Sequence, residues 1–235
     1  MPLLSDIPET ELIPMYFFSI LTMFISFGSL RDEQHHSYED RVLLPNWLAL
    51  FRGVRTVLES KDRAIYKSSI SYLFYSSEVN KIWQSNQSNI EALLRFQQYL
   101  ETSILTEDGT RQTLLDTFQD LRRALYFFYG EERSNEDRIR SLFTWMYRAS
   151  DGFNSLLRAG NHNALCVLAY FSVLLHRLEY NWWFQGWGIN LIDRIYSALD
   201  EVHRFWITWP IQQIGWIPRR NAGRSPYHNS LRKPE

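Results

Sequence analysis

The sequence predicts an all-α fold, a single helical domain of about seven to nine helices followed by a disordered C-terminal tail. Apolar residues recur at intervals of three and four along most of the chain, which is the spacing of one helix face. No segment alternates apolar and polar residues clearly enough to indicate a β-strand. The chain has 235 residues, of which 45% are hydrophobic, so it can build one substantial core. We divide it into an apolar N-terminal helix with a polar loop (1–40), a helical domain (41–216) and a basic tail (217–235).

The first expected helix covers residues 12–30, which carry no charge and nearly reach the roughly 20 residues that a bilayer span requires. The acidic residues Asp6, Glu9 and Glu11 precede it, whereas a secretory signal begins with basic residues. Pro14 and several hydroxyl residues dilute its hydrophobicity. We expect a buried core helix, and a membrane segment is the alternative.

A second helix is expected over residues 45–58. Pro45 is favoured in a first helical turn, and apolar residues follow it at helical spacing. Gly53 inside this helix costs about 1 kcal/mol relative to alanine, which indicates a closely packed neighbouring helix. Residues 61–83 are rich in serine and tyrosine and are expected to be partly helical linker.

Two longer helices are expected next, over residues 90–104 and 110–129. Asn89 is a suitable N-cap for the first of them, and Gly130 is placed to end the second. The residues expected to face the core are Ile90, Leu93, Leu94, Phe96, Leu100 and Ile104 in the first helix and Leu114, Leu115, Phe118, Leu121, Leu125 and Phe128 in the second.

The following helix is expected to start at Ser134, because Asp137 three residues later completes a capping-box spacing. We expect it to end near Gly152 and to be followed by a short helical turn over residues 153–157. Its buried residues should be Ile139, Leu142, Phe143 and Met146.

The last third of the domain carries the strongest pattern. Residues 164–178 are apolar nearly all round, which marks a helix at the centre of the core. The turn WWFQGWG follows, and its Gly186 and Gly188 allow backbone angles that bulky residues avoid. A final amphipathic helix from about residue 188 should bury one face, made of Ile192, Ile195, Leu199, Val202 and Trp206.

The residue pattern does not predict catalysis, a bound metal or a cofactor. The single Cys166 cannot form an internal disulfide or a multi-cysteine metal cluster. No two histidines flank a carboxylate with the spacing of a zinc protease, and glycine-rich phosphate loops and nucleophile elbows are missing. His35 and His36 lie in a polar segment, and adjacent side chains point apart, so we interpret them as a solvated loop. We therefore expect a protein that is not an enzyme.

Two segments resemble one known family. The first is the run from residue 164 to residue 210, with AL-x-VLAY-x-x-VLLHRL, then WW-x-QGWG, then an amphipathic helix ending W-x-x-WP. The second is PNWLALFRGVRTVL, residues 45–58. Both resemble the regulatory domain of fungal zinc-cluster transcription factors, in the branch of the sterol uptake control proteins. Between the apolar N-terminal segment and residues 45–58, this sequence is shorter than such family members.

The resemblance implies a transcription regulator that acts in the nucleus, with retention in the cytoplasm as a means of control. It implies a sterol or other lipid as effector, and other transcription-regulatory proteins or a second copy of the chain as partners. Family members carry a separate six-cysteine zinc cluster that binds DNA, and one cysteine cannot build it. The net charge of −1 also argues against direct contact with nucleic acid.

The candidate ligand-binding residues are His176, Trp182, Trp183, Phe184 and Trp187, all in or beside the tryptophan-rich turn. In the ligand-sensing interpretation they lie near an apolar cavity enclosed by helices over residues 45–58, 164–178 and 188–202. The same large aromatic residues are also ordinary core residues where helices meet. A helical interaction module without a pocket, or a membrane-anchored helical protein, are the alternative functions.

Overall fold

The computed structural model describes residues 77–103, 107–130 and 133–218, together with Glu11, Pro14, Phe18, Leu21, Thr22 and Ile25. Every regular element in these residues is helical, which confirms the all-α prediction. The expected helix over 45–58 with Gly53, most of the linker over 61–83, and residues 219–235 of the tail lie outside the described residues.

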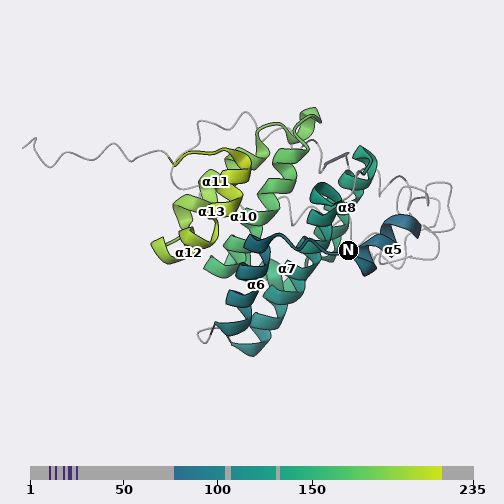
Figure 1. Ribbon diagram of the computed structural model, residues 1–235. Coiled ribbons are helices and arrows are strands. Elements are labelled where there is room, and N and C mark those ends of the chain that lie inside the picture. The colour runs from purple at the N-terminus through teal and green to yellow at the C-terminus, as the bar shows by residue number, and fades with distance from the viewer. Residues whose placement is uncertain are drawn as a thin grey trace, which may run out of the picture.

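Two long helices organise the described fold (Figure 1). Helix α10 packs against α11, α12 and α13, and helix α7 packs against α5, α6 and α8, while α9 contacts both. Because α7 and α10 also pack on each other, the two groups share one core. The helices are α5 (Ser77–Ser85), α6 (Glu91–Thr102), α7 (Asp108–Tyr129), α8 (Asn135–Arg148), α9 (Asp151–Arg158), α10 (His162–Arg177), the 3-10 turn η3 (Trp182–Phe184), α11 (Trp187–Ala198), α12 (Glu201–Trp206) and α13 (Thr208–Ile214).

Helix α10 is the central element that its composition predicts. All residues from Ala164 to Leu175 are buried, so the helix is covered on every side. Its N-terminus is capped by Asn161, whose side-chain oxygen accepts a hydrogen bond from the Ala164 backbone N–H at 3.0 Å. The basic residues His176 and Arg177 occupy its last turn, where positive charge is favoured by the helix dipole.

Helix α7 contains a buried arginine. Arg122 donates hydrogen bonds to the Ser88 carbonyl oxygen and the Asn89 side-chain oxygen, both at 3.0 Å, and to the side-chain oxygen of Gln97. Burial lowers the pKa of the Arg122 guanidinium. The predicted N-cap role of Asn89 is therefore wrong: Ile90 occupies the N-cap of α6, and the Asn89 amide serves the guanidinium instead.

Three local predictions in this region have different outcomes. The Ser134 hydroxyl accepts the Asp137 N–H at 3.1 Å, which confirms the expected N-cap of α8. Gly130 follows the last residue of α7, as expected. However, α8 ends at Arg148 rather than near Gly152, because Ser150 caps a new helix by accepting the Phe153 N–H at 3.1 Å.

The predicted core residues are mostly buried. The exception in α6 is Leu94, which is 42% exposed, because the neighbouring helices cover only the face that carries Leu93, Phe96 and Leu100. The predicted core of α8 also missed Trp145. This residue is fully buried, and its indole N–H donates to the Thr117 carbonyl oxygen at 3.0 Å.

The final amphipathic helix is not continuous, which corrects the prediction. Leu199 has extended backbone angles, and the Asp200 side chain then caps α12 by accepting the His203 N–H at 2.8 Å. An aspartate that caps a new helix competes with continuation of the preceding one. Val202, expected to be buried, is 67% exposed as a result of this break.

The described positions of the N-terminal segment are exposed, except Thr22, which is half-buried. Phe18, Leu21 and Ile25 all reach the surface, so this face is not part of the core that was expected to bury it. Among the described residues, we find no helix with both the length and the hydropathy needed to cross a bilayer.

Candidate functional site

The tryptophan-rich turn between α10 and α11 is built by a short series of backbone hydrogen bonds. The Asn181 N–H donates to the Leu178 carbonyl oxygen, and the Phe184 N–H donates to the Asn181 carbonyl oxygen, each at 2.9 Å. Gly186 then precedes α11 with φ of 81°, in the left-handed region that residues with a side chain rarely adopt. The turn therefore needs glycine at residue 186, as the sequence predicts.

Gly188 brings the two helices into direct backbone contact. A Cβ atom at this position would lie 2.5 Å from the His176 Cβ and 2.9 Å from both the His176 Cα and backbone nitrogen. Helix α11 thus begins against the last turn of α10. The proposed cavity cannot extend between the two helices at this contact, and its third wall, residues 45–58, lies outside the described residues.

The structure places the five candidate ligand-binding residues in three different environments. Phe184 is fully buried and lies with its ring centroid 6.4 Å from that of Phe143. Trp182 is 68% exposed, and its ring meets that of the half-buried Trp183 edge to face at 5.6 Å. Trp187 is also half-buried. The turn therefore anchors itself in the core through Phe184 and offers Trp182 to solvent.

His176, the remaining candidate, lies in the last turn of α10, just before the tryptophan-rich turn. Its Nδ1 atom is 3.2 Å from Glu179 Oε1, which is an ion pair when the ring is protonated. Both atoms are shielded from solvent. This arrangement places a polar pair directly beside the contact that Gly188 makes with the helix.

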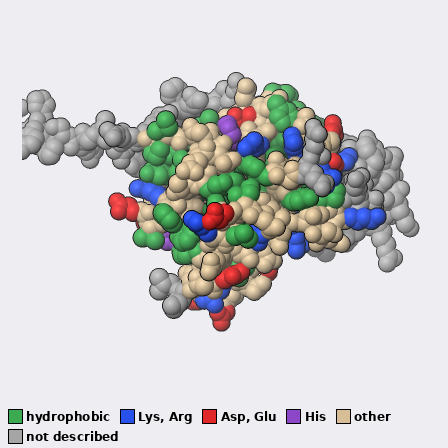
Figure 2. All heavy atoms as spheres, in the orientation of Figure 1, with side chains coloured by type: hydrophobic (Ala, Val, Ile, Leu, Met, Phe, Trp, Pro, Cys, Tyr) green, Lys and Arg blue, Asp and Glu red, His purple; other side chains and the backbone are tan. Residues whose placement is uncertain are grey.

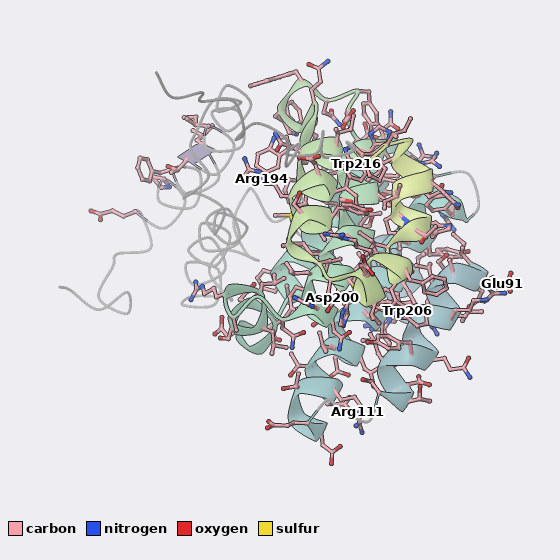
Figure 3. The ribbon with its side chains drawn as sticks, turned by 90° about the vertical axis from the view of Figure 1, so that its left-hand side faces the viewer. Glu91, Arg111, Arg194, Asp200, Trp206 and Trp216 are labelled. Carbon is pink, nitrogen blue, oxygen red and sulfur yellow. The ribbon has the colours of Figure 1, made fainter. Side chains whose placement is uncertain are left out.

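The tryptophans after the turn have a structural role at the other end of the C-terminal helices. Trp206 stacks on Tyr99 with ring centroids 4.3 Å apart, and Trp209 stacks on Tyr170 at 5.6 Å. The Tyr170 hydroxyl donates to the Trp206 carbonyl oxygen at 3.0 Å, and burial raises the pKa of this phenol. Figure 3 shows Trp206 near Asp200 at one level of the fold and Trp216 at another. These stacks hold α12 and α13 against α6 and α10.

A cluster that the sequence does not reveal lies beside Trp206. His162, Asp200 and His203 place their side-chain ligand atoms within 4.8 Å of one another. His162 is 38 residues from Asp200 along the chain, so no short motif links them. The only local sequence signal for this cluster is the three-residue spacing of Asp200 and His203. That spacing is common where an aspartate caps a helix, so it does not by itself indicate a cluster.

No protein-family model matches the sequence, and comparisons with curated proteins and with solved structures found no match either. The family resemblance therefore rests on the two sequence segments themselves.

Proposed function

We propose that the chain is an effector-sensing regulatory domain of the fungal zinc-cluster type, a transcription regulator without a DNA-binding zinc cluster in this sequence. The observation that carries the proposal is the junction between α10 and α11, the segment with the family-like sequence. There the fully covered central helix ends in a turn with one buried ring, Phe184, and one exposed ring, Trp182. A ligand or partner that contacts this turn is therefore linked to the core through the buried Phe184 ring.

The effector we propose is a sterol or another lipid with one polar group. Trp182, Trp183 and Trp187 offer apolar surface, and the partly exposed side chains of His176 and Glu179 offer polar atoms beside it. Binding would favour one arrangement of the turn over another, because a ligand shifts a conformational equilibrium by its difference in affinity for the two states. The partners that read this change would be transcription-regulatory proteins or a second copy of the chain, in the nucleus or as a means of retention in the cytoplasm.

Thermal denaturation of the untagged chain with sterols and fatty acids tests the effector. At about 100 times the Kd, a ligand that binds only the folded state should raise Tm by about 5 to 10 °C in a domain of this size. The Trp183→Ala variant should lose this shift. The matched control is Trp216→Ala, at a half-buried tryptophan outside the turn that packs on Tyr196. If no lipid raises Tm in a chain that melts cooperatively, the effector proposal fails.

A second candidate is an interaction module without a pocket. Gly188 leaves no room between α10 and α11 at their contact, and Tyr180, Trp182 and Ile189 are exposed around the turn. Exposed aromatic residues are enriched at protein interfaces. Figure 2 shows that hydrophobic side chains reach the surface in several patches on the face it presents. This function predicts that Trp182→Ala weakens capture of a partner while Tm stays unchanged with every lipid.

The membrane-anchored alternative depends on the N-terminal segment, where Phe18, Leu21 and Ile25 are exposed. A carbonate wash of membranes from expressing cells tests it. Release of the chain into the supernatant would exclude an integral anchor, and retention in the pellet would support one.

A further inference from the structure

Two imidazoles from separate parts of the fold converge on one carboxylate. His162 is the first residue of α10, Asp200 caps α12, and His203 lies in the first turn of α12. The His162 Nδ1 atom lies 2.8 Å from Asp200 Oδ2, and the His203 Nδ1 atom lies 2.7 Å from Asp200 Oδ1. The two imidazole rings meet nearly perpendicularly, with centroids 4.9 Å apart.

These distances are close to those of a metal site. A tetrahedral zinc ion with ligands at about 2.0 to 2.2 Å holds its ligand atoms about 3.3 to 3.6 Å apart. Small rotations of the three side chains would open each contact enough to admit the ion. The side chains of His162 and Asp200 are 36% and 46% exposed, so an ion can reach them from solvent.

The surroundings of the cluster are already arranged to hold the ligands. Asp200 Oδ1 also accepts the His203 backbone N–H at 2.8 Å, which fixes the carboxylate. Oδ2, which contacts only His162 among the cluster's side chains, is the oxygen that would take the ion. His203 Nε2 lies 3.5 Å from the Tyr99 hydroxyl, and Tyr99 is held by its stack on Trp206. His203 Nδ1 donates to the Asp200 carboxylate in this structure. An ion that displaces the Nδ1 proton would be held by Nδ1, with the remaining ring proton on Nε2 facing the Tyr99 oxygen.

The charge of the cluster suits a cation as well. The His203 backbone N–H, and then the two imidazoles, hold the pKa of the Asp200 carboxyl well below its usual range, so it stays ionised. The nearby Cys166 thiol is not a ligand: it is buried, burial raises its pKa, and it contacts the His203 carbonyl oxygen at 3.6 Å. The ligand set is therefore two imidazoles and one carboxylate, with the remaining position open to water.

We propose that His162, Asp200 and His203 bind a divalent transition-metal ion of the zinc class and thereby tie the start of α10 to the start of α12. Imidazole nitrogen favours zinc and its neighbours, whereas magnesium and calcium prefer oxygen ligands. Binding replaces the protons shared between the rings and the carboxylate.

Titration calorimetry of the untagged chain with Zn²⁺ tests the site. The background carries His35→Ala and His36→Ala, so that adjacent histidines elsewhere do not contribute. We expect one ion per chain and, at about 100 times the Kd, a Tm higher by about 5 to 10 °C. Mg²⁺ should give neither effect. Absence of Zn²⁺ binding in this background would overturn the proposal.

The Asp200→Asn variant separates metal binding from helix capping, because asparagine caps a helix as well as aspartate does. Loss of a group that only orients a ligand costs about 10 to 100-fold in affinity, so loss of the Asp200 carboxylate should cost at least about 100-fold. His162→Ala should act in the same way, and His176→Ala, outside the cluster, should leave Zn²⁺ affinity unchanged.

Long-range ¹H–¹⁵N NMR spectra provide a second readout that does not depend on stability. Zn²⁺ should shift the Nδ1 resonances of His162 and His203 and leave those of His176 in place. Equal affinity in the parent and in Asp200→Asn, or shifts confined to other histidines, would show that the ion binds elsewhere and would refute the site.

Discussion

Replacing Gly188 with alanine would place a methyl group in the contact between α10 and α11. The new Cβ would lie 2.5 Å from the His176 Cβ and 2.9 Å from two backbone atoms of the same residue. Real Cβ atoms do not approach other heavy atoms this closely, so α11 must move away from α10. The His176 backbone has little freedom to yield instead, because it continues directly from the fully buried stretch of α10 that ends at Leu175.

The expected loss of stability follows from two opposing effects. Alanine is favoured over glycine inside a helix by about 1 kcal/mol. Overpacking a well-filled contact costs about 1 to 3 kcal/mol, and a clash with backbone atoms lies at the upper end of that range or beyond it. The net loss should therefore be about 2 kcal/mol or more, which lowers Tm by at least about 4 to 8 °C in a domain of this size.

Urea and thermal denaturation followed by circular dichroism would measure the effect. Gly109→Ala is the matched control, because Gly109 lies in the first turn of α7 and a Cβ there would meet no atom within 4 Å. The control should be stabilised by up to about 1 kcal/mol. A Gly188→Ala protein as stable as the parent would refute the direct contact between the helices, and with it the argument that no cavity separates them there.

Other perturbations test other parts of the fold. Arg122→Ala should lower the free energy of unfolding in urea by at least about 1 to 3 kcal/mol, because it leaves acceptors at the buried Ser88 and the half-buried Gln97 unpaired; Arg122→Lys should not restore it, since an ammonium lacks the planar fork of the guanidinium. Trp145→Ala should cost about 3 to 5 kcal/mol, measured in the same way, because Trp145 is fully buried and stacks on Phe171 at 4.3 Å. Asp200 has a folded-state pKa below its unfolded value, so the stability it contributes is present above about pH 4 and is lost as pH falls further; in acid titrations of Tm without metal, the parent should lose more stability below that pH than Asp200→Asn does. A parallel decline in the two proteins would contradict that account of the carboxylate.

The sequence predicts a helix correctly wherever apolar residues recur along one face of that helix. The C-terminal end of α7 and the cap of α8 followed from Gly130 and Ser134, because these signals act within a few residues. The break before α12 did not follow, since the apolar spacing continues through Leu199 and Val202 while the Asp200 side chain ends the helix. Local capping overrode the periodic pattern there.

The features of the candidate site depend even more on tertiary structure. Gly186 could be assigned from the turn, but the contact of Gly188 with His176 depends on how α11 crosses α10. The cluster of His162 with Asp200 and His203 forms only when the beginnings of α10 and α12 meet. Pairings across such long stretches of chain leave no periodic signal in the sequence.

The continuous burial of α10 also has a consequence during synthesis. On the ribosome, α10 emerges before α11, α12 and α13, which cover much of it. The about 40 residues that complete this cover take roughly 2 to 8 s to appear at 5 to 20 residues per second. During that interval the apolar surface from Ala164 to Leu175 lacks the cover of α11, α12 and α13 and has only earlier helices, such as α7, α8 and α9, as partners among the described residues. Chaperone capture or aggregation of the nascent chain should therefore concentrate at this stage of its synthesis.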